Sequence, residues 1–515
     1  MRAPRRWLRY VPMLVAAGLA LSVLWPLRMA GYIDDDWGWL ALSRHLDSPL
    51  DAILGNVLGG YFWRPLPLTV DWLLGRAFDA SAGPRYALST IQHALSAALV
   101  TALVWNATRR RTDAALAGAL VAAAPAVSSL ALWLSNRNEL LSLNLGLAAL
   151  LALERALASG RVTSVRALAV GLLLMLALAS KESAYVFALA LMCRGALAWP
   201  ALTHQDRRRL AAGLLLPVMI ALVMRLQSVS EFAGMLEAES PLTIAARGVL
   251  AWFGLLPQAL GGFHQSGWRG LVVVVLLALP VVLAASKRAR ETIRSPLVVV
   301  GLVLLLVPAL VQWPVTGVVL HLADAAKVTV NQRFFALSAA GAALLAVGGL
   351  ALLRERKVPI LALVLVVALG VHASWRQTQA WSEATGVQGR AAEQAIDRLL
   401  TLLGDTPPSP CVLMLRTQAL PAGFADAAIK ARAPRHSALL DCTVFVDGRA
   451  PWYGFARSGQ CNDAVMAPAR LSPSVPVIDY GGVCQRVYEL PEAAHGDARI
   501  THFDLSLEQP VRIQD

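Results

Sequence analysis

Three consecutive aspartates, Asp34, Asp35 and Asp36, follow directly after the first long apolar run of the chain. Adjacent carboxylates repel one another, and a nearby low-dielectric membrane makes the repulsion more costly. A cation, a basic side chain or a shared proton must therefore offset it. Neighbouring positions do not face one another on a helix, so at most two of these carboxylates converge on one site. The pattern predicts a general base beside an acidic metal ligand. A solvated helix cap is the alternative.

A polar island, "LWLSNRNELLSL" at 132–143, interrupts two apolar runs. It places Asn136, Arg137, Asn138 and Glu139 within one turn between two predicted helices. Crowding of polar residues in an apolar hairpin indicates a site. A plain loop is the alternative, since an acid at a helix start also complements the helix dipole.

Basic residues near the other breaks in the apolar pattern could bind phosphate or carboxylate groups. Arg64 lies between aromatic residues and proline in "YFWRPLP", where an arginine can fork onto either group or extend toward the membrane interface. Lys181 adjoins Glu182 in "SKES". A lysine at this position is expected to bind the phosphate of an anionic lipid or to form an ion pair with a neighbouring acid.

Arg333 precedes two phenylalanines in "NQRFFALS" and follows His321, Asp324 and Lys327. A cation beside an apolar track could clamp the phosphate of a lipid, whereas anchoring of a helix end is the alternative. The lone His264 and His321 are interpreted as ordinary polar loop residues.

Composition points to lipid as the main solvent of the elements that position these residues. Of 515 residues, 57% are hydrophobic and 15% charged. Apolar runs of roughly 17–25 residues cross a bilayer as helices. We predict an all-α polytopic membrane protein with about eleven transmembrane helices, at 10–30, 86–106, 113–133, 138–157, 164–180, 184–199, 209–226, 270–286, 296–313, 333–352 and 358–376.

The net charge of +13 comes from short basic clusters between the apolar runs, so we expect no nucleic-acid partner. The positive-inside bias predicts a cytoplasmic N-terminus, and an odd number of spans then predicts an exported C-terminus. The first span lacks a small-residue cleavage site and is predicted to be retained. The basic clusters are Arg109–Arg111, Arg155/Arg161/Arg166, Arg207–Arg209, Lys287/Arg288/Arg290/Arg294 and Arg354/Arg356/Lys357.

Two longer outer loops break the alternation within the predicted transmembrane domain, 1–376. The loop 31–85 predicts short interfacial helices, and the loop 227–269 predicts an interfacial or re-entrant hairpin. From 377 to 515 the composition becomes that of a small soluble α/β domain, predicted to be periplasmic. A helix is expected in "AAEQAIDRLLTLLGD", and strands are expected in "CVLMLR", "CTVFVDG" and "CQRVYEL".

Four of the five cysteines lie in this C-terminal region. In an exported domain they can form two disulfides by any of three pairings. A zinc site is the less favoured alternative, because the spacing lacks a close cysteine pair. These residues are Cys411, Cys442, Cys461 and Cys484.

The order of "YFWRPL", "APAVSSLALWLSNRNELL", "SKES" and "NQRFFALS", together with the acidic first outer loop, resembles C-type (GT-C) glycosyltransferases. Within them the chain is most similar to bacterial relatives of the transmembrane O-mannosyltransferase group. The resemblance covers about residues 1–376. It implies transfer of a sugar from a polyprenyl-phosphate donor, on the periplasmic face of a bacterial inner membrane, to a glycan, lipid or protein acceptor.

The resemblance also implies roles for the residues above. Asp35 would be the general base and would also bind a divalent cation, Mg or Mn, with the help of Asp36 or Asp34. Glu139 would complete the acidic cluster. Lys181 and Arg333 would hold the phosphate leaving group, where positive charge is needed. The other substrate-binding candidates are Arg64, Asn136, Arg137 and Glu182.

Two other functions remain open. A transporter or flippase of a lipid-linked glycan would require polar residues in mid-span and repeated broken helices. A surface-polysaccharide polymerase or ligase would share the lipid-phosphate donor and differ in the acceptor.

Overall fold

The computed structural model describes residues 10–53, 63–226, 241–261, 267–311 and 332–404 of the helical part of the chain. In the C-terminal part it describes 411–420, 422–434, 437–446, 452–457, 470–471, 478–479, 483–490, 497, 499–505 and 511–513. The predictions for Tyr61, His264, His321, Asp324 and Lys327 fall outside these residues.

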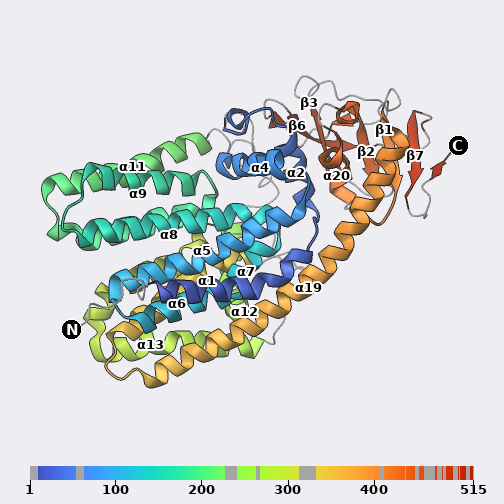
Figure 1. The fold of residues 1–515 in the computed structure, drawn as a ribbon. Helices are drawn as coiled ribbons and strands as arrows, with labels where there is room; N and C mark the ends of the chain where they lie inside the picture. The colour runs from blue at the N-terminus through green and yellow to red at the C-terminus, as the bar shows by residue number, and fades with distance from the viewer. Residues whose placement is uncertain are drawn as a thin grey trace. The chain divides into compact units, whose positions relative to one another are not determined.

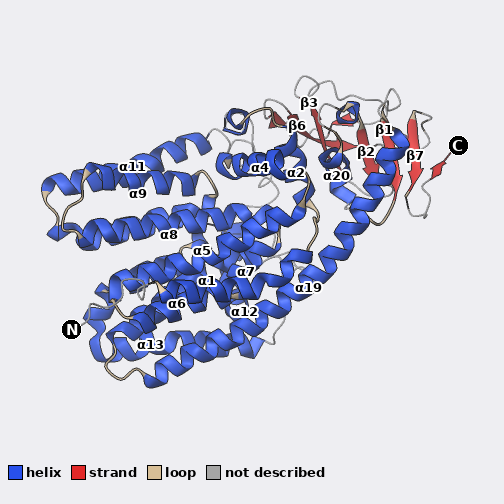
Figure 2. Cartoon of the chain, in the orientation of Figure 1, coloured by secondary structure: helices blue, strands red, loops and turns tan. Residues whose placement is uncertain are grey.

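Helices make up nearly all of the described residues before 404, and most of the strands follow (Figures 1 and 2). The α-helices are α1 Val11–Leu24, α2 Asp35–His45, α4 Pro65–Phe78, α5 Ala82–Thr108, α6 Arg111–Ala123, α7 Pro125–Leu132, α8 Arg137–Ala158, α9 Ser164–Leu178, α10 Tyr185–Ala198, α11 His204–Leu226, α12 Pro241–Gly261, α13 Gly267–Arg294, α14 Pro296–Leu306, α15 Pro308–Val311, α18 Ala336–Leu352, α19 Lys357–Leu403 and α20 Ala425–Arg432. Short 3₁₀ turns directly precede four of them: η3 Leu134–Asn136, η4 Glu182–Ala184, η9 Gln332–Phe335 and η10 Ala422–Phe424.

Eight helices among the described residues are long and apolar enough to cross a membrane, and the bent pair α6–α7 forms a ninth candidate. Each of the eleven predicted spans contains a helix, and nine of them match these candidates. The other two, 164–180 and 296–313, contain the shorter apolar helices Ser164–Leu178 and Pro296–Val311. The protein is a polytopic helical membrane protein with a small α/β region at its C-terminus. In the loop 227–269, α12 covers Pro241–Gly261, of which Gly248–Gly261 is a shorter apolar helix.

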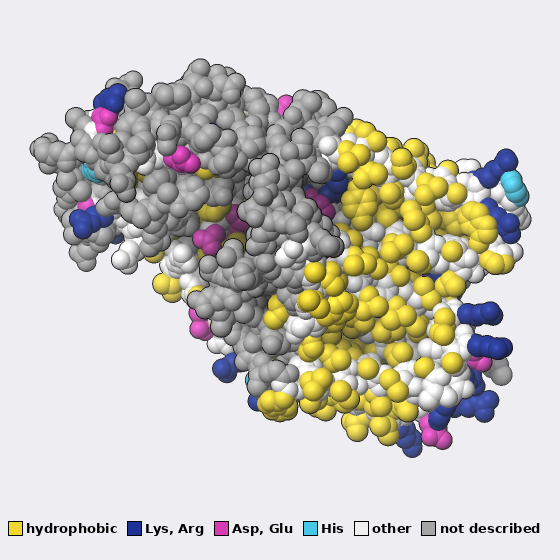
Figure 3. All heavy atoms as spheres, turned by 180° about the vertical axis from the view of Figure 1, so that it is seen from behind, with side chains coloured by type: hydrophobic (Ala, Val, Ile, Leu, Met, Phe, Trp, Pro, Cys, Tyr) yellow, Lys and Arg dark blue, Asp and Glu magenta, His cyan; other side chains and the backbone are white. Residues whose placement is uncertain are grey.

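The surface of the helices fits this assignment. Large aliphatic side chains are exposed on it, and Figure 3 shows them as a broad hydrophobic area with Lys and Arg gathered along one end. Leu14, Leu168, Leu216, Val275 and Leu361 are each more than half exposed. Apolar side chains exposed to this extent on many helices are typical of a lipid-facing surface.

The break between α6 and α7 shows how the helices keep backbone groups satisfied. Pro125 has no N–H, and the axes of the two helices differ by 50°. Two carbonyls at the break accept hydrogen bonds from neighbouring helices: His93 Nε2 donates to Ala122 O at 3.1 Å, and Ser374 Oγ donates to Ala123 O at 2.9 Å. Lipid offers no other donor for these carbonyls.

The chain divides into two compact units. The first comprises residues 1–28, 86–223 and 236–381, and the second comprises 29–85, 224–235 and 382–515. The predicted helix after residue 390 proves to be the end of the 47-residue α19, which begins in the last predicted span. The predicted outer loop 31–85 groups with the C-terminal region, and the boundary at 376/377 stays a prediction.

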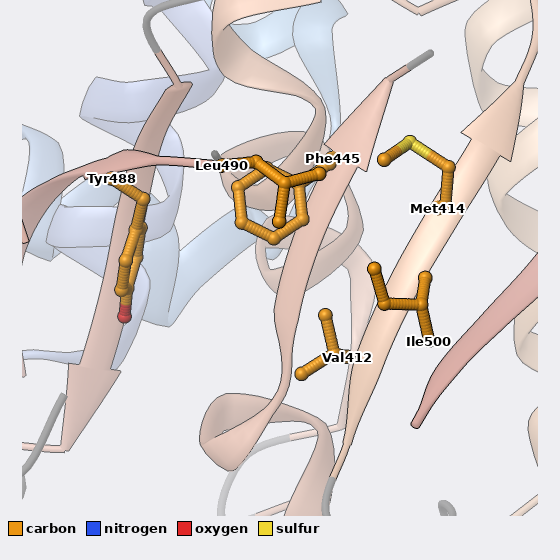
Figure 4. Packing of buried hydrophobic residues seen from close by; sticks show 6 residues of the cluster. All are labelled: Val412, Met414, Phe445, Tyr488, Leu490 and Ile500. Atoms are coloured by element: carbon orange, nitrogen blue, oxygen red, sulfur yellow. The ribbon is translucent and has the colours of Figure 1, made fainter. Parts of the chain in front are cut away.

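The second unit holds two sheets. The first has the order β2-β1-β7-β8, with β1 parallel to β2 and β7, and β6 pairs with β3, β4 and β5 in the second. Figure 4 shows the buried cluster Val412, Met414, Phe445, Tyr488, Leu490 and Ile500. The predicted strands are confirmed by β1 Val412–Arg416, β2 Thr443–Val446 and β6 Val483–Glu489; the others are β3 Trp452–Arg457, β4 Arg470–Leu471, β5 Ile478–Asp479, β7 Ile500–Asp504 and β8 Val511–Ile513.

A disulfide and a buried ion pair stabilise this unit. Cys411 is bonded to Cys442, which joins the starts of β1 and β2, and Cys484 is also disulfide-bonded. Lys430 of α20 is fully buried and donates to Asp426 Oδ2 at 2.8 Å and to Cys442 O at 2.7 Å. Asp426 also accepts the backbone N–H of Phe455, so the pair ties the helix to β3.

Side chains of α2 donate hydrogen bonds to carbonyls at the C-terminal end of α20, in the same unit. His45 Nε2 donates to Lys430 O at 2.7 Å, and Arg44 donates to Ala431 O. Carbonyls in the last turn of a helix lack partners within it and carry partial negative charge, so they favour donors of this kind. Arg44 also pairs with Asp79 at 2.7 Å.

Candidate functional site

Three helices of the first unit begin at one place. The turns η3, η4 and η9 precede α8, α10 and α18. A side chain of η9 bonds to Asn136, the N-cap residue of α8, and a side chain of η4 bonds to Glu139 in the first turn of α8. The backbone N–H groups of a first helical turn have no partner within the helix and carry partial positive charge. The N–H groups of Arg137 and Tyr185 already bond to carbonyls of η3 and η4, but the positive ends of three helix dipoles remain at this site and favour an anion.

Arg333 lies in η9 and reaches the α8 turn. Its Nη1 donates to Asn136 Oδ1 at 3.0 Å. The guanidinium carbon lies 4.7 Å from the centre of the Trp133 ring and 4.9 Å from that of Phe334. Aromatic faces attract a cation, so the guanidinium is held between two rings and an amide.

Lys181 and Ser183 meet Glu139 in the same turn of α8. Ser183 Oγ donates to Glu139 Oε1 at 2.5 Å, and Lys181 Nζ lies 3.7 Å from Glu139 Oε2. Glu139 is buried at 4% exposure, so its charge requires these partners. Asn136 and Glu139, three residues apart, thus contact the cations of two separate loops.

The remaining candidates in this unit belong to the same elements, α8 and η4. Arg137 is buried at the start of α8, and Glu182 is partly exposed at the start of η4. Arg64, in the second unit, is the N-cap residue of α4, directly before Pro65.

The three aspartates belong to the second unit and occupy different environments. Asp36 is buried, and its Oδ2 accepts the backbone N–H of Ile33 at 3.3 Å, which is a capping interaction at the start of α2. Asp34 has a positive φ of 38°, a strained conformation for a residue with a side chain. Asp35 is the first residue of α2 and is partly exposed.

The pKa of Asp34 is raised from its ordinary value by desolvation. Although the residue as a whole is exposed, the chain packed around its carboxyl group disfavours the charged form. Backbone strain and a raised pKa at one residue are typical of functional positions.

A polar cavity of about 540 Å³ also lies in the second unit. Gly31, Asp79, Arg390, Glu393 and Arg432 line it, and Arg432 pairs with Glu393 at 3.7 Å. It adjoins the segment that leads into the three aspartates.

Among the described residues, the side chains around the predicted metal ligands do not form a metal centre. Within the described ranges, no group of three or more His, Cys, Asp or Glu side chains could hold a metal ion. Mg and Mn require a set of oxygen ligands, and Asp36 already caps its own helix. The chemistry proposed below is derived without a metal.

Two residues at the first-unit site had no predicted role. Trp133 and Ser183 both lay inside the motifs singled out, "LWLSNRNELL" and "SKES", and neither was assigned a role. The tryptophan immediately before a polar island was the available signal. Phe335 was missed too: it stacks on the fully buried Trp252 at 5.3 Å and so holds η9 in place.

No protein-family model and no curated protein sequence matches this chain. Among solved structures, it is similar to the archaeal oligosaccharyltransferase AglB from Archaeoglobus fulgidus, in complex with an inhibitory peptide and a dolichol-phosphate. The sequence identity is 12% and the TM-score 0.45, with 82% of this chain and 64% of that chain covered. The chain thus spans less than two thirds of AglB. A similarity of this size carries no conclusion about activity, which depends on the residues described above.

Proposed function

We propose that this protein is a membrane glycosyltransferase that moves a sugar from a polyprenyl-phosphate donor to a glycan, lipid or protein acceptor. The observation that carries the proposal is the convergence of three helix N-termini with Arg333 and Lys181 in the first unit. Such a site binds the phosphate of the donor and stabilises the negative charge that develops as it leaves.

The surroundings of Arg333 fit a lipid-linked phosphate better than a free one. Trp133 and Phe334 flank the guanidinium, and Trp252 stacks on Phe335. An apolar polyprenyl chain would pack on aromatic rings of this kind while the phosphate contacts the cation. Aromatic residues around a phosphate-binding cation therefore support a donor with a lipid chain.

In this proposal Glu139 positions the residues of the η4 turn and does not take part in proton transfer. Its buried carboxylate holds Lys181 and Ser183, which fixes the η4 turn beside the start of α8. A buried acid already engaged by two partners is poorly suited to accept the acceptor's proton.

We retain Asp35 as the general base. Asp35 is partly exposed at the first position of α2, whereas Asp36 is buried and its carboxylate accepts the backbone N–H of Ile33. In the proposed step the acceptor hydroxyl loses its proton to Asp35 and its oxygen forms a bond to the anomeric carbon. The bond from that carbon to the phosphate oxygen breaks, the electron pair stays on the phosphate, and the configuration inverts.

The buried polar groups of the spans argue against a transporter. His93 and Ser374 serve the carbonyls at the α6–α7 break, and Asn144 bonds to Ser96 Oγ at 2.7 Å and to Gln92 O at 2.9 Å. Hydrogen bonds of this kind join membrane helices to one another. A polymerase or ligase would use the same phosphate site and remains the second candidate.

The test is mass spectrometry of surface glycans, lipid A and exported proteins from a deletion strain. We expect one sugar to be missing from one of these classes and to return with the wild-type chain. Asp35→Asn should fail to restore it, whereas Asp47→Asn, an exposed aspartate of the same loop, should restore it. Full restoration by Asp35→Asn would remove the base assignment. Accumulation of a complete lipid-linked glycan without a missing linkage would indicate a flippase.

A further inference from the structure

A second cavity, of about 690 Å³, lies at the opposite ends of the same helices. α8, α10 and α18 start at the phosphate site and end at this cavity, which their last residues line. The 22 residues of α8 rise about 33 Å, so the two sites are separated by roughly the thickness of the apolar part of a membrane. No function assigned above uses this cavity.

Positive groups dominate its polar lining. Arg194 forks onto Glu154, with Nε 2.5 Å and Nη2 3.0 Å from the two carboxylate oxygens, which leaves its Nη1 for another partner. Arg110 Nη1 donates a hydrogen bond to Ala351 O at 3.0 Å. Since Glu154 neutralises one of the two arginines, the other charge remains for a ligand.

The start of α14 adds to this positive character. Ser295 is its N-cap residue and lines the cavity, but its side chain makes no capping hydrogen bond. Pro296 follows at the first helical position, and the N–H groups of the first turn lack partners within the helix. The helix dipole therefore favours an anion at the same place as Arg110.

The rest of the lining is apolar, with Leu157, Leu202 and Leu352 among its members. A cavity with cations at one part of its wall and aliphatic side chains at another fits an amphiphile better than a free ion. It also opens among the basic loops that the positive-inside bias places at the cytoplasmic leaflet, which is rich in anionic lipid.

We propose that this cavity binds the phosphate head group of an anionic membrane phospholipid, with Arg110 and the start of α14 contacting the phosphate. Inorganic phosphate shares the chemistry of the head group, so an experiment must separate the two sources. The apolar lining predicts that the lipid binds and the free anion does not.

The experiment uses the purified full-length protein in detergent. Phosphatidylglycerol, phosphatidylcholine with the same acyl chains, and inorganic phosphate are titrated separately, with bound lipid counted by native mass spectrometry and the unfolding temperature recorded. The variant is Arg110→Ala. Its matched control is Arg111→Ala, which removes the same charge from an exposed neighbour outside the cavity lining.

We expect phosphatidylglycerol to bind and raise the unfolding temperature, and phosphatidylcholine and phosphate to have little effect. Arg110→Ala should raise the Kd for phosphatidylglycerol about tenfold, the loss expected for one charge-assisted hydrogen bond, while Arg111→Ala leaves it within about twofold. Equal losses in the two variants would show attraction to a basic surface and overturn the proposal. An equal effect of inorganic phosphate, or equal binding of phosphatidylcholine, would overturn it too.

Discussion

Arg333 and Asn136, 197 positions apart in sequence, are joined by a 3.0 Å hydrogen bond from Nη1 to Oδ1. The same guanidinium lies over Trp133, so one side chain joins the start of α18 to the residues just before α8. Binding of a phosphate at this arginine would therefore add to a preorganised contact rather than order a mobile side chain.

Replacement of Arg333 should affect the donor selectively. We expect Arg333→Ala to raise the donor KM by about 10- to 100-fold, and Arg333→Lys to recover part of the loss, because lysine keeps the charge but lacks the planar fork and its ring stacking. Steady-state kinetics with separately varied donor and acceptor would measure this. Arg354→Ala, an exposed arginine after α18, is the control. Equal losses for donor and acceptor would indicate a collapsed structure.

We expect substitution of Glu139 to show that it positions Lys181 and does not take part in the reaction itself. Glu139→Gln leaves Lys181 without its carboxylate partner, and we expect a stability loss of about 1–3 kcal/mol together with weaker donor binding. The double variant Glu139→Gln/Lys181→Met should recover stability but not donor binding, since the ion pair is then removed as a whole. Thermal unfolding in detergent and a donor-binding assay separate the two effects. Full activity of Glu139→Gln would contradict the positioning role.

The buried Lys430 should make stability depend on pH. Burial is the main cause that lowers the Lys430 pKa from 10.5 to about 8, while Asp426 acts in the opposite direction. Between these two values the unfolded chain binds more protons than the folded one, so unfolding free energy should rise with pH, by up to about 3 kcal/mol. Below pH 8 both states hold the proton and this slope vanishes.

Chemical unfolding of the full chain from pH 7 to 9.5 would test this. The double variant Lys430→Met/Asp426→Asn replaces both charged groups and should lose the rise above pH 8. A slope that persists unchanged in the double variant would assign it to another group.

The Cys411–Cys442 disulfide should contribute strongly to stability. It closes a loop with a sequence separation of 31 residues, for which the loss of chain entropy corresponds to about 3–4 kcal/mol. The double variant Cys411→Ala/Cys442→Ala should unfold at a correspondingly lower denaturant concentration. Cys193→Ala, which removes the half-buried free cysteine of α10, is the control and should leave unfolding of the second unit unchanged. An unchanged midpoint in the double variant would contradict the expectation.

Local patterns were sufficient for the helices of the predicted spans and for three of the strands. Each predicted span contains a helix, and β1, β2 and β6 lie where short apolar runs follow or include a cysteine. These features depend on composition within a window of a few turns, which is the scale at which hydrophobic periodicity acts. The end of α19 was separated from the last span in the prediction because its composition turns polar, although the backbone continues as one helix.

Contacts between distant segments could not be obtained in the same way. Arg333 was recognised as a phosphate-seeking cation, but its bond to Asn136 depends on how α18 packs against the helices around it. The capping role of Asp36 is visible only when the turn at Ile33 is known, because three adjacent aspartates look alike in sequence. The residue types were therefore predictable, and their partners were not.

The contacts of Arg44 and His45 with the end of α20 link residues 387 and 385 positions apart. A ribosome adding roughly 5–20 residues per second needs about 20–80 s to make the intervening chain. Throughout that interval the segment after the first span lacks the carbonyls that its arginine and histidine finally engage. Maturation of this protein must therefore wait for the last hundred residues, and truncation at the C-terminus should impair the earliest loop to be synthesised.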